Sequence, residues 1–337
     1  MSVTADSATL PSMSFWTNLP PSFLVLAPME DVTDLVFRRL VCDHGEPDVL
    51  MTEFTSADLL CSPRADRALE RLQVYPGELN RRPLVAQIWG ANPVTLGRAA
   101  RLCSDLGFAG IDINMGCPVR KISKKGACSA LIRFPALAAE LIRAVQENAQ
   151  GLPVSVKTRI GWSEPETEAW CGHLLEQNLD ALTIHGRTAA QKSEGPADWG
   201  EIAKVVRLRN TMGVPTRIIG NGDANRDNEE RLFVESGVDG IMVGRGIFQD
   251  LGLFSKKDYC PFLTWPEHTK LELLQRHVKD HWETWKGHKD YEKLKKFFKN
   301  YTQGFKGALE LRARLMETHD HVTSLKVLND WAGKKKS

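Results

Sequence analysis

The sequence predicts an α/β fold: a (β/α)8 TIM barrel over residues 21–255, followed by a small all-helical domain over residues 256–337. Short apolar runs alternate with amphipathic stretches between Phe23 and Phe254, and eight such units in about 230 residues match the size of this barrel. Polar residues follow nearly all of the runs, which is where barrel active sites form. A doubly wound open sheet is the alternative. Its glycine-rich phosphate turn is missing after the first run, which ends in Ala27-Pro28-Met29.

The predicted strands are continuous apolar runs, as expected for parallel strands that are buried on both faces. They cover residues 24–29, 49–53, 84–89, 110–115, 154–160, 181–185, 217–220 and 240–243. Helical spacing fills the intervals, most clearly at residues 33–42, 93–106, 135–148, 166–177, 199–209 and 225–236. Asn92 and Asp198 are good N-terminal signals for two of these helices, and Gly107, Gly151 and Gly237 follow the ends of others.

Beyond Phe254 the strand pattern stops. A loop with Pro261 and Pro266 leads to helical stretches at residues 267–285, 291–301, 307–318 and 321–332, so this part is predicted to be all-helical. Residues 1–20 are polar, with no basic start and no long apolar core. We therefore expect them to form a loose leader rather than a signal peptide.

The composition is that of an ordinary globular protein, with 42% hydrophobic and 26% charged residues. No run of about 18 apolar residues exists, so no membrane helix is expected. The seven Cys are scattered without a CxxC pair, which favours reduced cytosolic thiols over disulfides or a zinc site. We expect a cytoplasmic monomer with no metal site and no stable protein partner.

The formal net charge of +2 hides an asymmetry. Residues 256–337 carry 18 Lys and Arg against 11 Asp and Glu, whereas residues 1–255 carry 26 against 31. A basic end on an acidic body suggests a module that binds a polyanion. Charge alone leaves open that the helices are lysine-rich only to stay soluble.

Cys117 follows the fourth predicted strand and stands between Gly116 and Pro118. A thiol in such a tight loop at a barrel mouth can be a nucleophile, a general acid or a metal ligand. Residues 119–131 hold four basic residues, which is typical of a flexible active-site loop. Cys128, in this loop, is a second candidate, whereas three other cysteines fall inside helical patterns and are expected to pack.

Polar side chains also end the third and fifth predicted strands. Gln87 has an amide that donates and accepts at once, which suits the edge of a flavin or a nucleobase. Lys157 and Arg159 share one face of their strand, and cations in a barrel mouth need an anionic or electron-rich partner. Lysine suits the anionic edge of a reduced flavin, and arginine suits uracil carbonyls or a phosphate. Alternatively, both pair with Asp112 or Glu53 inside the barrel.

Glycines flank polar residues after the last two predicted strands, in Asn221-Gly222-Asp223 and Gly244-Arg245-Gly246. The loops after strands seven and eight are the recurring phosphate site of this barrel, and glycines let backbone N–H groups approach the phosphate. Because no Rossmann fingerprint is present, FMN fits better than a permanently bound dinucleotide. His185 stands at the end of the sixth strand, before Gly186.

The helical part contains a basic cluster interleaved with aromatic residues. The lysines are Lys293, Lys295, Lys296, Lys299 and Lys306, and the aromatic residues are Phe297, Phe298, Tyr301 and Phe305. This combination suits neutralisation of an RNA backbone with additional stacking. At helical spacing the aromatic residues equally suit a core, and the lysines equally suit a solvated face.

Taken together, these motifs resemble the tRNA-dihydrouridine synthase family of the bacterial type, over nearly the whole chain from Leu26 onward. The matching segments are residues 26–29, 32–34, 52–53, 87, 112–118, 156–159, 185–188, 191, 195–199, 221–223, 244–246 and 296–304. The run from Asn114 to Pro118, with the basic loop after it, is the most specific of them.

The resemblance implies an FMN-dependent oxidoreductase that uses NADPH to reduce the C5–C6 double bond of a uridine in the tRNA D-loop. Hydride passes from flavin N5 to C6, and Cys117 gives the proton to C5, so its thiol acts as an acid. The implied flavin contacts are Pro28, Met29, Glu30, Gln87, Lys157 and His185, and the implied phosphate contacts are Asn221, Gly222, Asp223, Gly244 and Arg245. Asn114 and Arg159 are implied to recognise the uracil, which must leave the RNA stack to enter a barrel mouth.

Three positions depart from the family pattern: Asp31 and Cys128 replace a usual glycine, and Ser193 replaces a common aromatic residue. Two other functions stay open. One is a non-catalytic RNA-binding protein on a retained barrel. The other is an FMN barrel that reduces a free small molecule such as a pyrimidine or an enone, against which the basic helices weigh.

Overall fold

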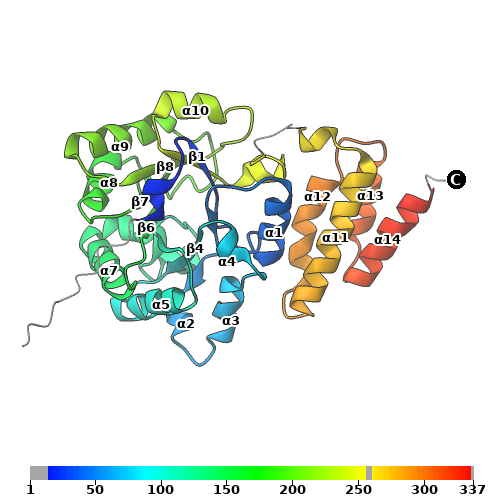
Figure 1. Cartoon of the computed structure of the whole chain (residues 1–337), viewed down its shortest axis with the longest axis horizontal. Coiled ribbons are helices and arrows are strands. Elements are labelled where there is room, and N and C mark those ends of the chain that lie inside the picture. Colours follow the sequence, from blue (N-terminus) through cyan, green and yellow to red (C-terminus); the bar gives the residue numbers. More distant parts are fainter. Residues whose placement is uncertain (1–13, 256–259, 335–337) are drawn as a thin grey trace, which may run out of the picture.

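The protein is a closed parallel barrel with a group of helices packed beside it, as seen in a computed structural model that describes residues 14–255 and 260–334 (Figure 1). The barrel strands are β1 (Phe23–Leu26), β2 (Leu50–Met51), β4 (Leu84–Trp89), β5 (Gly110–Asn114), β6 (Val154–Arg159), β7 (Ala181–His185), β8 (Arg217–Asn221) and β9 (Gly240–Val243). They follow one another in the order β1-β9-β8-β7-β6-β5-β4-β2, and every pairing is parallel.

The barrel closes between its first and second strands. Val25 of β1 forms a parallel bridge with Val49, just before β2, and the N–H of Leu26 donates to the Val49 carbonyl at 3.1 Å. A short additional strand, β3 (Thr55–Ser56), pairs with the end of β4. The (β/α)8 barrel predicted from the apolar runs is thereby confirmed, because every predicted run overlaps an observed strand.

Helices surround the barrel as the spacing predicts. They are α1 (Leu35–His44), α5 (Pro93–Asp105), α7 (Pro135–Asn148), α8 (Thr167–Leu175), α9 (Trp199–Met212) and α10 (Glu229–Ser236). The caps act as predicted: the carboxylate of Asp198 accepts the N–H of Glu201, and Asn92 accepts that of Val94. Short helices that the spacing did not predict lie between β2 and β4: α2 (Ala57–Leu60), α3 (Asp66–Leu69), η2 (Glu70–Leu72) and α4 (Glu78–Arg81).

The described part of the predicted leader is packed rather than loose. Residues Phe15–Asn18 form a short 3-10 helix, and Trp16 is only 1% exposed. Its ring centroid lies 6.0 Å from that of Phe23 at the start of β1, so Trp16 closes the N-terminal end of the barrel. The prediction of a loose segment is therefore wrong for residues 14–20, and residues 1–13 lie outside the described part.

The C-terminal helices pack against α1 (Figure 1). They are α11 (Glu267–Trp285), α12 (Phe298–Tyr301), α13 (Ala308–Met316) and α14 (His321–Lys334). Residues Tyr291–Phe297, predicted as part of an α-helix, form the 3-10 helix η6 instead. Three aromatic residues of the basic cluster, Phe297, Phe298 and Tyr301, are buried core residues, and the Phe297 ring centroid lies 4.9 Å from that of Phe37 of α1.

None of the helices in the described part of the chain is long and apolar enough to cross a bilayer.

Candidate active site

A cavity of about 540 Å³ opens at the C-terminal ends of the strands, where loops after β1, β6, β7, β8 and β9 meet. Nine of the predicted cofactor residues line it: Pro28, Met29, Lys157, His185, Asn221, Gly222, Asp223, Gly244 and Arg245. The size is within the roughly 300–1,000 Å³ typical of ligand pockets. Residues far apart in sequence therefore converge on one site because parallel strands end at the same face of the barrel.

Lys157 lies in β6 and directs its ammonium group to β8, which is the second strand away in the barrel. Its Nζ donates to Asn221 Oδ1 at 2.9 Å, and Asn221 Nδ2 donates in turn to the Met242 carbonyl at 2.8 Å. Burial, with the nearby charge of Arg159, lowers the pKa of Lys157 to about 8. The expected alternative, a bond to Asp112 or Glu53, is not what the structure shows for Lys157.

His185 is held by an arginine of the same His-Gly-Arg-Thr run, for which the sequence indicated no role. Arg187 Nη1 lies 3.1 Å from His185 Nε2, and the buried guanidinium also donates to the Gly195 carbonyl and to Asp223. Burial and the surrounding cations lower the pKa of His185 to about 2, so the imidazole is neutral at physiological pH. Arg187 is therefore a positioning residue for this side of the cavity.

The glycine turns after β8 and β9 give the cavity a backbone lining. Gly222 has a φ of 126°, and a Cβ there would lie 2.5 Å from the Cβ of Ala197 and 3.1 Å from the His185 ring. Only glycine fits this close approach without displacing its neighbours. Arg245 is exposed, and its Nη2 donates to Asp223 Oδ1 at 3.2 Å, which leaves a cation at the rim of the cavity.

Gln87 and Asn114 belong to a buried network beneath the mouth. Gln87 Nε2 donates to Asp112 at 2.7 Å, and its Oε1 accepts from Asn114 Nδ2 at 2.9 Å. Gln87 is fully buried in this network, and its predicted contact with a flavin stays a prediction. Burial raises the pKa of Asp112 to about 6, although bonds from Ser155 and Gln87 oppose the shift.

Asn114 shapes the loop that carries Cys117. Its Oδ1 accepts the N–H groups of Gly116 at 3.0 Å and Cys117 at 2.9 Å. These bonds fix the position of the loop and of its thiol. The predicted contact of Asn114 with a uracil stays a prediction.

Arg159 holds the same loop from the next strand. Its guanidinium donates to the carbonyls of Gly116 at 2.7 Å, Thr188 at 3.0 Å and Lys192 at 2.8 Å. Burial lowers the pKa of Arg159 to about 10. The side chain thus ties the loops after β5 and β7 together, rather than pairing with Asp112 or Glu53.

Cys117 is half-buried at this mouth and has the electrostatics of a protonated thiol. Burial raises its pKa above the usual value, and the cations Arg159 and Lys157 only partly offset that effect. Cys128 lies fully buried with a φ of 55°, and burial raises its pKa well above the usual value. Only Cys117 of the two has access to a ligand.

Three of the residues predicted to contact a ligand form ion pairs or hydrogen bonds with other residues of the protein. Glu30 is exposed, does not line the cavity and pairs with Arg71 at 3.1 Å. Lys295 is 8% exposed and donates to the Met316 carbonyl and to Glu292, so its ammonium group is bonded within the protein and its predicted RNA contact stays a prediction. Lys293 pairs with Asp31 at 2.7 Å.

Two exposed lysines of the basic cluster, Lys296 and Lys299, lie beside the cavity at the strand ends. Both line a groove of about 650 Å³ between the barrel and the helices, which shares Arg245 and Gln249 with the cavity at the strand ends. Among the described residues, no group of three or more His, Cys, Asp and Glu side chains is arranged to hold a metal ion.

A (β/α)8 barrel with a polar cavity at the C-terminal ends of its strands and a half-buried thiol at its mouth has the layout of a barrel enzyme's active site. The family model described as "Dihydrouridine synthase (Dus)" matches residues 25–336. The chain therefore belongs to the dihydrouridine synthase family, and since dihydrouridine is reduced uridine, the family consists of oxidoreductases.

Two relatives illustrate the similarity. "Probable tRNA-dihydrouridine synthase 2" of Bacillus subtilis (strain 168) is 42% identical over 328 residues, which cover 95% of this chain and 97% of the relative. "Probable tRNA-dihydrouridine synthase" of Staphylococcus aureus (strain MRSA252) is 39% identical over 324 residues, which cover 94% and 95%. Among solved structures, an old yellow enzyme homologue from Zymomonas mobilis has a TM-score of 0.47 and 13% identity, covering 68% of this chain and 86% of its own.

Proposed function

We propose that this protein is a tRNA-dihydrouridine synthase that reduces the C5–C6 double bond of a D-loop uridine, with FMN as cofactor and NADPH as reductant. The observation that carries the proposal is the half-buried Cys117 thiol, on a loop held by Asn114 and Arg159, at the mouth of a barrel whose cavity suits a phosphate-bearing cofactor. tRNA is its proposed partner, and the cytoplasm is its proposed location.

The lining of the cavity fits FMN by its chemistry. Lys157 and Arg245 provide cations, and the glycine turns at Gly222 and Gly244 expose backbone close to the space. These groups suit a phosphate at one end and an electron-rich ring at the other. Bound FMN, once reduced, would supply the hydride that this reduction needs.

The protein's own residues provide the proton and the geometry. A thiol with a raised pKa keeps its proton at neutral pH, and Cys117 can therefore give it to C5 as charge develops there. Asn114 and Arg159 fix the loop that carries the thiol, from two different strands. We propose that they act as positioning residues.

The rim beside Cys117 offers a cationic surface for the RNA. Arg120, Lys121, Lys124, Lys125 and Arg133 are all exposed, residues 119–134 contain no Asp or Glu, and none of these five cations forms an ion pair with a described residue. The Arg133 guanidinium also lies 4.3 Å from the centroid of the Trp162 ring. Cations without carboxylate partners release counterions when they bind phosphates, so this rim and the pair Lys296 and Lys299 are the proposed tRNA contacts.

Neutralising the rim is expected to weaken tRNA binding and reduce its dependence on salt. For Lys121→Ala/Lys124→Ala/Lys125→Ala, the slope of log K against log salt should fall by roughly one for each phosphate that the variant no longer neutralises. The matched control removes three exposed arginines from the outer barrel helices, Arg98→Ala/Arg143→Ala/Arg207→Ala, and should keep the slope. Equal slopes for both triple variants would contradict this path for the RNA.

The function is tested with the unmodified chain. The purified protein should be yellow, and expression in a strain that lacks its own dihydrouridine synthases should restore dihydrouridine at one or more D-loop positions, mapped by mass spectrometry. A protein that binds tRNA but carries no flavin would instead support a non-catalytic RNA-binding role. A flavoprotein that reduces a free pyrimidine or enone but leaves tRNA unmodified would support small-molecule reduction.

A further inference from the structure

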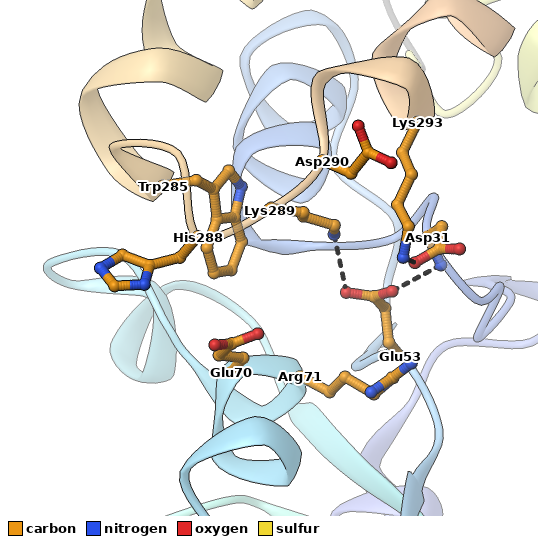
Figure 2. Close-up of a pocket in the computed structure, with 9 residues that line it drawn as sticks. All are labelled: Asp31, Glu53, Glu70, Arg71, Trp285, His288, Lys289, Asp290 and Lys293. Carbon is orange, nitrogen blue, oxygen red and sulfur yellow. Dashed lines mark hydrogen bonds and ion pairs between the residues drawn. The ribbon is translucent and has the colours of Figure 1, made fainter.

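A pocket of about 170 Å³ lies where the loop after α11 meets the barrel, and charged side chains from both sides line it (Figure 2). Glu53 comes from the barrel, just after β2, and Asp31 comes from the loop between β1 and α1. Lys289 and Lys293 come from the helical part, after α11 and within η6. Figure 2 shows the two lysines reaching across the pocket toward the two acidic residues.

Lys289 connects two buried carboxylates of the barrel. Its Nζ donates to Asp34 Oδ2 at 2.8 Å and to Glu53 Oε2 at 3.2 Å. Asp34 Oδ1 caps α1 by accepting the N–H of Phe37 at 3.0 Å. Glu53 Oε1 accepts the backbone N–H of Asp31 at 2.5 Å.

Because the carboxylates of Asp34 and Glu53 are buried, they need the Lys289 ammonium group beside them. The side chains of Glu53, Asp34 and Lys289 are 2%, 8% and 10% exposed. Buried carboxylates are costly in the charged form unless a cation is bonded to them. Burial raises the pKa of Glu53 even though Lys289 lies beside it, whereas at Asp34 burial is outweighed by the bonds and charge of Lys289 and the pKa is lowered. The ammonium therefore offsets the burial of Asp34 and part of that of Glu53.

Asp31 stands in a backbone conformation that needs support. Its φ is 57°, in the left-handed region that is unfavourable for a residue with a side chain. Glu53 holds the Asp31 N–H, and Lys293 Nζ holds the Asp31 carboxylate at 2.7 Å. The turn is therefore fixed from the barrel on one side and from the helical part on the other.

This turn is continuous with the lining of the cofactor cavity. The N–H groups of Val32 and Thr33 both donate to the Met29 carbonyl at 3.1 Å, and the Met29 N–H donates to Thr33 Oγ1 at 2.9 Å. Met29 and the preceding Pro28 line the cavity. Asp31 therefore stands in the same hydrogen-bonded turn as Met29, two residues from the cavity lining.

We propose that Lys289 and Lys293 are positioning residues through which the helical part fixes the β1–α1 loop against the cofactor. The inference rests on the proposed function and adds a second role for the helical part, besides RNA contact. A helical part that is displaced from the barrel would release the loop and lower the rate of reduction. Neither lysine touches the reacting atoms.

The experiment compares flavin-loaded Lys289→Met and Lys293→Met with Lys279→Met, which removes an exposed lysine from α11. At saturating tRNA and NADPH, kcat of the first two should fall by about 10-fold to 100-fold, as expected for a small misplacement of reacting groups. Flavin should also dissociate more readily, as measured by its recovered fluorescence. Lys289→Arg, which keeps the charge, should retain more activity than Lys289→Met.

Thermal unfolding of each variant separates positioning from loss of structure. If Lys289→Met does not fold, Lys293→Met decides the outcome, because Lys293 is 38% exposed and its loss leaves no buried charge unpaired. Wild-type kcat and wild-type flavin retention in folded Lys289→Met and Lys293→Met would overturn the inference. An inactive wild-type protein would instead overturn the proposed function.

Discussion

Replacing Cys117 by alanine is expected to abolish dihydrouridine formation while leaving the flavin bound. Cys117 does not line the cavity that we propose for the flavin, so we expect its loss to remove no flavin contact. It does remove the protonated thiol at the mouth, and loss of a general acid lowers a rate by about 10²-fold to 10⁴-fold. Dihydrouridine in transfer RNA, measured by mass spectrometry, and flavin content, measured by absorbance, report the two properties separately.

Cys128→Gly is the matched control for this experiment. It removes the other thiol of the same loop, and glycine tolerates the φ of 55° that Cys128 adopts. Because Cys128 is fully buried, this variant should remain active. Full activity of Cys117→Ala would remove Cys117 as the proton donor, and equal losses in both variants would indicate damage to the loop rather than to the chemistry.

The sequence predicts the barrel well because each strand has a signal within its own residues. Each strand is a short apolar run, and the runs at residues 84–89 and 240–243 coincide with β4 and β9. The strand ends then place Lys157, His185 and Asn221 around one cavity, since the topology brings them together. Family motifs and fold geometry therefore identify the same side of the barrel.

Contacts between distant segments could not be predicted in this way. Lys295 belongs to a basic cluster in sequence, but the helix crossing that buries it against Met316 has no local signal. Gln87 stands at a strand end, but its amide forms hydrogen bonds with Asp112 and Asn114, which are 25 and 27 residues further along the chain. The prediction for the leader was wrong for a related reason: Trp16 packs against the barrel floor, and nothing in its polar surroundings indicates that partner.

Arg38 is a residue for which the sequence indicated no role, and its replacement is expected to have the largest effect on stability. Its guanidinium is fully buried in α1 and makes four hydrogen bonds: two to Glu78, at 2.6 and 2.9 Å, and one each to the carbonyls of Thr33 and Gln73, at 2.8 Å. Arg38→Met leaves the Glu78 carboxylate buried without its cation. Breaking such a buried pair costs about 3–5 kcal/mol in the free energy of unfolding.

The neighbouring residue provides the control, because Arg39 is exposed on the same helix and Arg39→Met should change the unfolding free energy by less than about 0.5 kcal/mol. Denaturant unfolding of the flavin-loaded proteins measures both.

Arg38→Met/Glu78→Leu should be more stable than Arg38→Met alone, since an apolar pair leaves no uncompensated charge. A double variant as unstable as the single one would show that Arg38 acts through the carbonyls of Thr33 and Gln73. These bonds join the end of the β1–α1 loop to the segment before α4, so the stability of this region and the shape of the cofactor loop would then depend on the same side chain.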